Sequence, residues 1–239
     1  METDRLGKRY GRRWALADCT LAVPAGQVVG LVGPNGAGKT TLLELAVGLL
    51  RPTTGTVRVS ARAGFVAQGA PVYPDLTVAD HLRMGQALND RWDAGLARRQ
   101  IGAAGLDPRQ RAGRLSGGQR ARLALALAVA RRPALLMLDE PAASLDPLAR
   151  REFLDSVATA ASADGVTVLF SSHLVADLER TCGYLIVLAA SRVRLAGPVS
   201  TLLRRPANPT SPNYASPTNP TGFTSLDDLV VAALREDPR

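Results

Sequence analysis

The 239-residue sequence lacks the features that mark membrane-spanning, secreted and disulfide-stabilised chains. Its best apolar run, Tyr184 to Ala190, has the length of a strand and falls well short of the roughly 18 residues that span a bilayer. The charged N-terminal segment has no apolar core of a secretory signal. Cys19 and Cys182 are the only cysteines, and they lack metal-ligand spacing. We therefore expect a globular cytoplasmic protein with two reduced thiols.

Lysine is also scarce, although the formal net charge is +8. Lys8 and Lys39 are the only lysines, so nearly all basic residues are arginines. A basic surface can favour nucleic acid, anionic lipid or a nucleotide polyphosphate. A scatter of solvated arginines is the simpler interpretation of the charge. With so few lysines in the chain, Lys39 is not expected to serve surface charge alone.

The order of the predicted elements indicates an α/β fold with an inserted helical subdomain. Strands are expected as short elements within 1–27, with a very short first strand, and at 27–31, 57–59, 64–67, 135–138 and 166–170. Helices are expected at 41–50 and 148–161, and helical signals dominate 77–133. The apolar runs at 135–138 and 166–170 are typical of buried strands in a parallel sheet.

The composition changes at Arg205. Residues 205–222 are rich in Pro, Asn, Ser and Thr, which predicts a flexible linker. A last helix is expected within 223–239, with Ser225 as its cap and Asp228 three residues later. Its apolar residues share one face, which predicts that the helix docks on the domain: Leu226, Leu229, Val230 and Ala233.

A glycine-rich loop is the clearest chemical motif. The stretch GPNGAGKTT fits the phosphate-loop pattern G-x-x-x-x-G-K-[ST] between a predicted strand and a predicted helix. Backbone N–H groups and the helix N-terminus would surround phosphates. Lys39 would reach the β and γ phosphates, and the Thr40 hydroxyl would bind Mg²⁺. The candidate residues are Gly33, Pro34, Asn35, Gly36, Ala37, Gly38, Lys39, Thr40 and Thr41.

Two acids directly follow the apolar run at 135–138. A carboxylate at the end of such an apolar strand is expected to have a partner, because burying an unpaired charge costs several kcal/mol of free energy. Asp139 is the natural outer ligand of Mg²⁺, and Glu140 can polarise an attacking water. The alternative is that both acids simply cap the turn at Pro141.

Three further polar residues are predicted to stand at the ends of apolar strands: Gln68, Asp146 and His173. Each is a weak signal when taken singly. In α/β sheets, however, ligands bind at the carboxyl ends of the strands, so we expect these residues to converge on one edge.

Residues 116–119 form a second motif, which opens a strongly apolar helix without a lysine beside it. Ser116 and Gln119 have the spacing of a capping box. Glycine is unfavourable in a first helical turn unless something must approach the backbone closely, and Gly117 and Gly118 stand there. Since the chain already has a phosphate loop, this second anion site lacks a ligand of its own. It is therefore interpreted as half a site.

Together, these motifs resemble the ATP-binding cassette of ABC transporters. The resemblance covers residues 1–204 and rests on the following series, in this order: GPNGAGKTT, Gln68, LSGGQ, LLMLDEP, ASLD and His173. It implies a P-loop NTPase (RecA-like) core, an N-terminal antiparallel β subdomain, and a helical subdomain at 75–132 that carries LSGGQ.

The resemblance also implies a role for each motif residue. ATP and Mg²⁺ are the expected ligands, with Lys39 and its loop on the phosphates, and the metal contacted by Thr40, Gln68 and Asp139. Glu140 is then the catalytic base, and His173 touches the γ phosphate and helps to position Glu140 and water. Tyr10 is expected to stack on adenine, with Trp14 as the alternative. Asp146 of ASLD joins the nucleotide-binding set.

Partners follow from the same resemblance. Ser116, Gly117, Gly118 and Gln119 would hold the γ phosphate bound to the other cassette of a head-to-tail dimer, whether that is an identical chain or a paralogue. A separate transmembrane permease is expected, which would place the chain peripherally on the inner face of the plasma membrane. The stretches YPDLTVADHL, SSHLVADLE and SLDDLVVAAL resemble bacterial drug, antibiotic or peptide exporters.

Two other classes stay open. One is a soluble cassette ATPase that acts on nucleic acid or ribosomes, and the other is a regulatory module that has lost hydrolysis. Nucleic acid is not the expected partner, because the chain has one cassette and no coiled-coil heptads. Retention of Lys39, Asp139, Glu140 and His173 argues against loss of hydrolysis.

Overall fold

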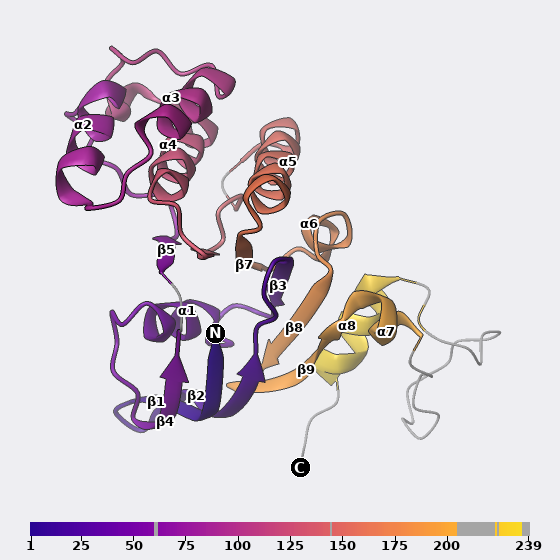
Figure 1. Cartoon of the computed structure of the whole chain (residues 1–239). Helices are drawn as coiled ribbons and strands as arrows, with labels where there is room; N and C mark the ends of the chain where they lie inside the picture. Colours follow the sequence, from indigo (N-terminus) through magenta and orange to yellow (C-terminus); the bar gives the residue numbers. More distant parts are fainter. Residues whose placement is uncertain (60–61, 144, 205–222, 224, 236–239) are drawn as a thin grey trace.

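A computed structural model gives the fold and describes residues 1–59, 62–143, 145–204, 223 and 225–235. The chain forms a small antiparallel sheet, a central sheet and a separate helical region (Figure 1). The strands are β1 (Glu2–Tyr10), β2 (Arg13–Ala22), β3 (Val28–Val32), β4 (Thr54–Arg58), β5 (Ala63–Val66), β6 (Leu135–Leu138), β7 (Thr167–Ser172), β8 (Tyr184–Ala189) and β9 (Arg192–Pro198). The helices are α1 (Lys39–Ala46), α2 (Val78–Leu88), α3 (Ala94–Ala103), the 3₁₀ helix η1 (Ala112–Arg114), α4 (Gly117–Ala130), α5 (Pro147–Asp164), α6 (Val175–Glu179), α7 (Val199–Leu203) and α8 (Leu226–Arg235).

The central sheet has the strand order β5-β6-β7-β3-β8-β9. The strands from β5 to β8 pair in parallel, and only β9 runs antiparallel to its neighbour β8. The loops that follow β3, β5, β6 and β7 therefore leave the sheet at the same edge. This edge is where a parallel α/β sheet binds its ligands.

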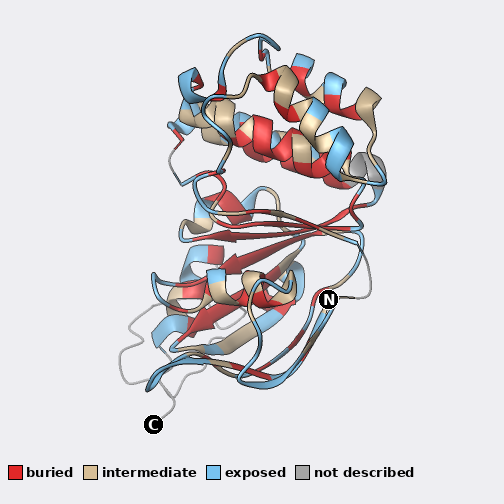
Figure 2. Ribbon diagram, turned by 90° about the vertical axis from the view of Figure 1, so that its left-hand side faces the viewer, coloured by how far each residue is buried: buried red, intermediate tan, exposed pale blue. Residues whose placement is uncertain are grey.

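Side chains of the central sheet alternate between two hydrophobic cores. Leu136, Leu138 and Phe170 belong to the core that also contains residues of α4, α5, α6 and α8. Met137 and Leu169 belong to the other core, which contains residues of α1 and of the antiparallel sheet. Figure 2 shows the buried strands of this sheet between the helical layers. Because apolar side chains cover both faces of the sheet, the polar side chains of its parallel strands lie at the ends of those strands.

The helical region has a core of its own, built from residues of α2, η1, α3 and α4 such as Val78, Ile101 and Leu123. A capping box starts α2, in which Asp80 N–H donates to Thr77 Oγ1 at 3.1 Å and Thr77 N–H donates to Asp80 at 2.9 Å. Hydrogen bonding from Thr77 holds the pKa of the Asp80 carboxyl below its usual value. The predicted helical stretch between β5 and β6 is thus confirmed.

The prediction of a very short first strand is wrong. β1 has nine residues and pairs with both β2 and β4, and β2 has ten residues. Bulges interrupt the register, and Arg5 and Asp18 have positive φ angles of 43° and 56°. An extra residue at a bulge shifts the alternation of buried and exposed side chains, so the period of two that marks a strand is broken in the sequence.

The C-terminal helix α8 lies against α6, α7, β8 and β9 (Figure 1). Ser225 caps it, since Asp228 N–H donates to Ser225 Oγ at 3.1 Å. Its apolar face is buried, as the sequence predicted: Leu226, Leu229, Val230 and Ala233. The predicted linker at 205–222 lies outside the described residues.

Both cysteines are free. Burial raises the pKa of the Cys19 thiol and raises the pKa of the Cys182 thiol to about 12. Both side chains are therefore neutral thiols near neutral pH, and neither belongs to the site described below. Among the described helices, none combines the length and hydropathy that crossing a bilayer requires.

Candidate functional site

A pocket of about 530 Å³ opens at the edge of the central sheet where β3, β5, β6 and β7 end. Its lining comes from the N-terminal hairpin, from the loop before α1 and from the segments that follow β5, β6 and β7. The lining residues are Tyr10, Arg13, Ala15, Asn35, Gly36, Gly38, Lys39, Thr40, Thr41, Gln68, Glu140 and His173. The structure therefore brings together residues that are distant in sequence, of which Tyr10 and His173 are 163 positions apart.

The loop between β3 and α1 can be formed only with glycine at two positions. A Cβ atom at Gly33 would lie 2.0 Å from the carbonyl oxygen of Leu188. Gly38 has φ of 104°, and a Cβ there would lie 2.3 Å from the carbonyl oxygen of Ala15. The loop consequently packs tightly against β2 and β8 and presents its backbone, together with the N-terminus of α1, to the pocket.

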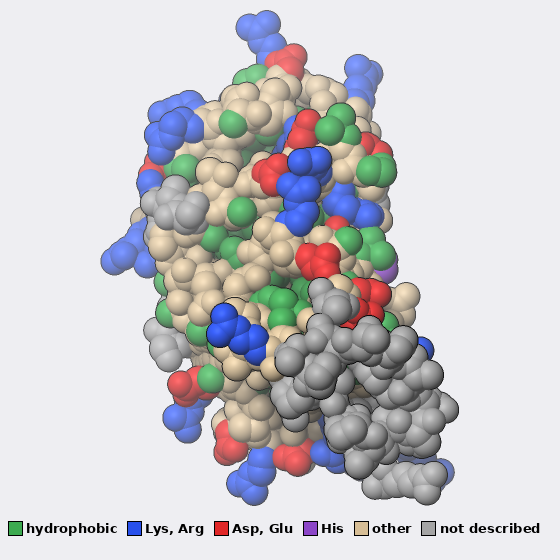
Figure 3. Space-filling view, turned by 90° about the vertical axis from the view of Figure 1, so that its right-hand side faces the viewer, with side chains coloured by type: hydrophobic (Ala, Val, Ile, Leu, Met, Phe, Trp, Pro, Cys, Tyr) green, Lys and Arg blue, Asp and Glu red, His purple; other side chains and the backbone are tan. Residues whose placement is uncertain are grey.

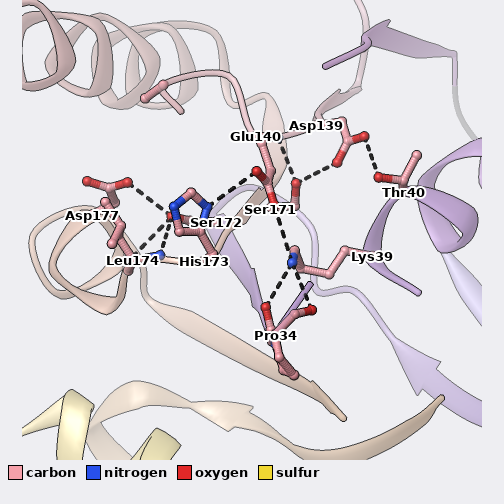
Figure 4. A network of polar contacts seen from close by, with 12 residues as sticks. Pro34, Lys39, Thr40, Asp139, Glu140, Ser171, Ser172, His173, Leu174 and Asp177 are labelled. Atoms are coloured by element: carbon pink, nitrogen blue, oxygen red, sulfur yellow. Dashed lines mark hydrogen bonds and ion pairs between the residues drawn. The ribbon is translucent and has the colours of Figure 1, made fainter. Parts of the chain in front are cut away.

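Lys39 is buried with only 5% of its surface exposed, at the base of this pocket. Its Nζ donates to the carbonyl oxygens of Gly33 at 2.8 Å and Pro34 at 3.3 Å (Figure 4). Glu140 Oε1 lies 3.3 Å from the same Nζ. A buried ammonium needs such partners, and its position beside the helix N-terminus makes the pocket suitable for an anion.

Asp139 is 1% exposed and immediately follows β6. Its Oδ2 accepts a hydrogen bond of 2.7 Å from Thr40 Oγ1, and its Oδ1 accepts one of 2.7 Å from Ser171 Oγ. The described residues contain no cluster of three or more His, Cys, Asp or Glu that could hold a metal by itself. Mg²⁺ in nucleotide sites typically uses one or two carboxylates together with substrate phosphates, so a hydroxyl beside a buried carboxylate fits this ion.

Glu140 occupies the centre of the site. Its Oε2 lies 3.3 Å from His173 Nδ1, while its Oε1 faces Lys39 (Figure 4). The backbone of Glu140 has φ of 43°, which is uncommon for a residue with a side chain and is often found at functional sites. The sequence predicted that Glu140 and His173 act together, and in the structure the two side chains lie in contact.

Tyr10 lines the pocket and is 50% exposed at the end of β1. Trp14 does not line it and faces a separate depression with Asp4, Asp18 and Arg192. Lys8 Nζ lies 5.4 Å from the centroid of the Tyr10 ring. An aromatic ring at the mouth of the pocket is thus available for stacking at Tyr10 and not at Trp14.

The expected position of Asp146 at a strand end is wrong. β6 ends at Leu138, and Asp146 lies beyond the intervening loop as the exposed N-cap of α5. Its carboxylate accepts from the backbone N–H groups of Leu148 at 3.1 Å and Ala149 at 2.9 Å. Asp146 does not line the pocket, because the segment after Glu140 leads to the N-terminus of α5 and forms no further strand.

Residues 116–119 also lie outside the pocket lining. The predicted capping box is present, since Gln119 N–H donates to Ser116 Oγ at 3.2 Å and Ser116 N–H donates to Gln119 Oε1 at 2.9 Å. A Cβ at Gly118 would lie 3.4 Å from Ala149 Cβ, which is an ordinary contact. Packing within the chain therefore does not require glycine at position 118.

Two polar residues of the site, Arg13 and Ser171, were not predicted from the sequence. Arg13 lines the pocket from β2, where it looks like one of many surface arginines. Ser171 contacts both Asp139 and Glu140 and lies near the end of β7, directly after the apolar run at 166–170. The one signal for Ser171 in the sequence was its place between this apolar run and His173, two positions before the histidine.

The fold and the site define a P-loop nucleoside-triphosphate-binding protein, because a phosphate loop follows one parallel strand and buried acids follow its near neighbour in the sheet. A family model described as ABC transporter matches residues 16–143. The "Uncharacterized ABC transporter ATP-binding protein YdbJ" of Bacillus subtilis is 32% identical over 211 residues, which cover 81% of this chain and 68% of that protein. The "Aliphatic sulfonates import ATP-binding protein SsuB" of Shigella flexneri is 37% identical over 203 residues, covering 80% and 77%.

A solved "Structure of ATP binding subunit of ABC transporter" has a TM-score of 0.76 and 26% identity, covering 85% of this chain and 91% of that one. The chain belongs to the ABC transporter family. It is an ATP-binding subunit of an ABC transporter and an ATP hydrolase. The fold class expected from the sequence is confirmed, including the antiparallel β subdomain and the helical region.

Proposed function

We propose that the pocket holds ATP with Mg²⁺ and that Glu140 is the base that activates the attacking water. The observation that carries this proposal is the contact between Glu140 and both Lys39 and His173, each at 3.3 Å. Lys39 and the glycine-rich loop hold the phosphates, and Asp139, Thr40 and Gln68 surround the metal. When bound, Mg²⁺ neutralises charge on the phosphate oxygens.

His173 acts beside Glu140 in this proposal. Its side chain is 40% exposed, and the residue directly follows β7, where it lines the pocket. A polar group at this position can contact the transferred phosphate and hold the Glu140 carboxylate toward the water. Phosphoryl transfer needs such positioning and electrostatic stabilisation more than covalent help.

Residues 116–119 of the LSGGQ motif complete the site of a second cassette in a head-to-tail dimer, identical or paralogous. They stand at the N-terminus of the 14-residue helix α4, outside their own chain's pocket, and Gly118 leaves its backbone accessible without an internal packing reason. The first N–H groups of a helix lack intrahelical partners, so a helix N-terminus suits a γ phosphate that approaches from another chain. We extend the predicted nucleotide-binding role of Asp146 to the same interface, since it caps α5 beside Gly118's neighbour Ala149.

The partner that would couple hydrolysis to transport is a separate transmembrane permease, which would hold this chain at the inner face of the plasma membrane. Membership of the ABC transporter family supports this partner. The sequence prediction of an exporter stays a prediction. The SsuB relatives do not support it, because they are named as importers of aliphatic sulfonates.

Action on nucleic acid has little to support it. On the face shown in Figure 3, acidic and basic side chains of the described residues are interspersed and form no continuous basic strip. Nucleic-acid interfaces gather Lys and Arg on one face or along one helix. None of the relatives described above is named for nucleic-acid binding.

Purification from membranes tests the proposed partner. We expect the tagged full-length chain, solubilised with mild detergent, to retain a polytopic membrane protein that mass spectrometry identifies. The Glu140→Gln variant with ATP should retain it as well, because binding and not hydrolysis maintains the complex. Recovery of the chain with ribosomes or DNA and no membrane protein would overturn this part of the proposal.

Replacement of Tyr10 by alanine should weaken ATP binding by about 1–3 kcal/mol, or about 5-fold to 150-fold in Kd, because one stacking contact with the base is lost. Trp14→Ala is the matched control, since Trp14 lies on the same hairpin but faces a different depression. Titration with a fluorescent ATP analogue measures both variants. Equal weakening in the two variants would contradict the assignment of Tyr10 to adenine.

A further inference from the structure

We infer that Ser171 is a positioning residue. Its single hydroxyl fixes the carboxylate of Asp139, the acid proposed to support the metal, relative to the backbone of Glu140, the proposed base. This inference rests on the roles proposed above for those two acids. Ser171 belongs to β7, where every side chain is buried, and it is 0% exposed. A hydroxyl in such a strand is unfavourable unless its hydrogen-bonding groups have partners.

The hydroxyl of Ser171 has partners on both sides. Its Oγ donates to Asp139 Oδ1 at 2.7 Å and accepts from Glu140 N–H at 2.7 Å (Figure 4). A hydroxyl has one hydrogen, so the donor role toward Asp139 leaves lone pairs for Glu140. Asp139 Oδ2 accepts from Thr40 Oγ1 at 2.7 Å, so the carboxylate is oriented from both ends.

The hydrogen bond to Glu140 restrains a strained turn. Glu140 has φ of 43°, and a non-glycine residue in this region persists only where its surroundings hold it. Without the Ser171 hydroxyl, the Glu140 N–H would lose its partner at the edge of a buried strand. The backbone could then relax and move the Glu140 carboxylate away from Lys39 and His173, each now 3.3 Å from it.

One hydroxyl therefore links the two halves of the chemistry. The Ser171 hydroxyl orients the Asp139 carboxylate toward Thr40. It also fixes the backbone of Glu140, and with it the direction of the Glu140 side chain. The adjacent Ser172 does a different task, because its Oγ contacts Leu174 and Asp177 and neither acid. Ser171 is thus the side chain that couples the metal side of the pocket to the base.

An isosteric pair of variants tests this inference, since Ser171→Thr keeps the hydroxyl and Ser171→Val has the same shape without it. We expect Ser171→Val to lower kcat about 10-fold to 100-fold, as loss of an orienting partner typically does, with little change in KM for ATP. Ser171→Thr should retain most of the activity. Ser156→Ala, which removes one serine hydroxyl bonded to the Glu152 carbonyl on α5, is the control and should match the wild type.

A second readout does not depend on turnover. In a Glu140→Gln background, the Mg²⁺ concentration that half-maximally tightens binding of a fluorescent ATP analogue should rise with Ser171→Val and not with Ser171→Thr. Equal kcat and equal Mg²⁺ dependence for the two Ser171 variants would overturn the inference. If Glu140→Gln itself keeps near-normal turnover, the proposed role of Glu140 fails instead, so the two failures are distinguishable.

Discussion

The Glu140→Gln variant should bind ATP and hydrolyse it about 10² to 10³ times more slowly than the wild type, a loss of roughly 3–4 kcal/mol in transition-state stabilisation. The amide keeps the size of the side chain but loses the negative charge that faces Lys39 and His173 at 3.3 Å. It also loses the basic oxygen that would accept the proton of water. Binding should persist, because the phosphate loop and Lys39 are untouched. Release of inorganic phosphate and binding of a fluorescent ATP analogue measure the two effects.

Glu152→Gln is the matched control for this change. Glu152 lies on α5, is half exposed and pairs with Arg122 away from the pocket, so its variant should hydrolyse ATP like the wild type. Near-normal turnover in Glu140→Gln would remove Glu140 from the mechanism. A parallel loss of ATP binding would assign Glu140 to the binding of nucleotide and not to hydrolysis.

Ser116→Arg should spare ATP binding by the single chain and abolish ATP-driven dimerisation, with hydrolysis reduced at least about 10²-fold because one preorganised set of donors is missing. Ser116 caps α4 outside the pocket, so a large charged side chain there obstructs an approaching chain and not the chain's own nucleotide. Light scattering of the purified chain with and without ATP measures the assembly.

The control for this variant is Ser225→Arg, since Ser225 caps α8 with the same kind of bond to a backbone N–H. Both variants lose a helix cap, which costs about 0.5–2 kcal/mol of stability. Only Ser116→Arg should lose the dimer. If ATP still drives dimerisation of Ser116→Arg, the proposed sharing of the site between two chains is wrong.

The nucleotide loop and the buried acids could be predicted because their chemistry is local in sequence. The six consecutive residues 135–140 predict both a buried strand and the two acids that follow it. β6 has the bounds expected from the sequence. The helix caps Ser116 and Ser225 were equally predictable, since each cap and its partner lie within four residues. These features depend on no distant part of the chain.

Features that depend on distant parts of the chain were not readable. The length of β1 was hidden by bulges at which Arg5 and Asp18 interrupt the alternation. Asp146 was misplaced because nothing in its short motif distinguishes a strand end from a helix cap. The role of Ser171 follows only from the pairing of β6 with β7, which sets Leu138 beside Phe170 and so brings Ser171 next to Asp139.

The central claim is that each chain carries only part of a hydrolytic site, which a second chain completes. The specific ATPase activity of the wild-type chain, measured over a wide range of protein concentration, tests this claim most directly. We expect activity per chain to rise with concentration as ATP-bound chains associate, and to level off once dimers predominate in light scattering. Constant activity per chain over a range in which the chain stays monomeric would contradict the account.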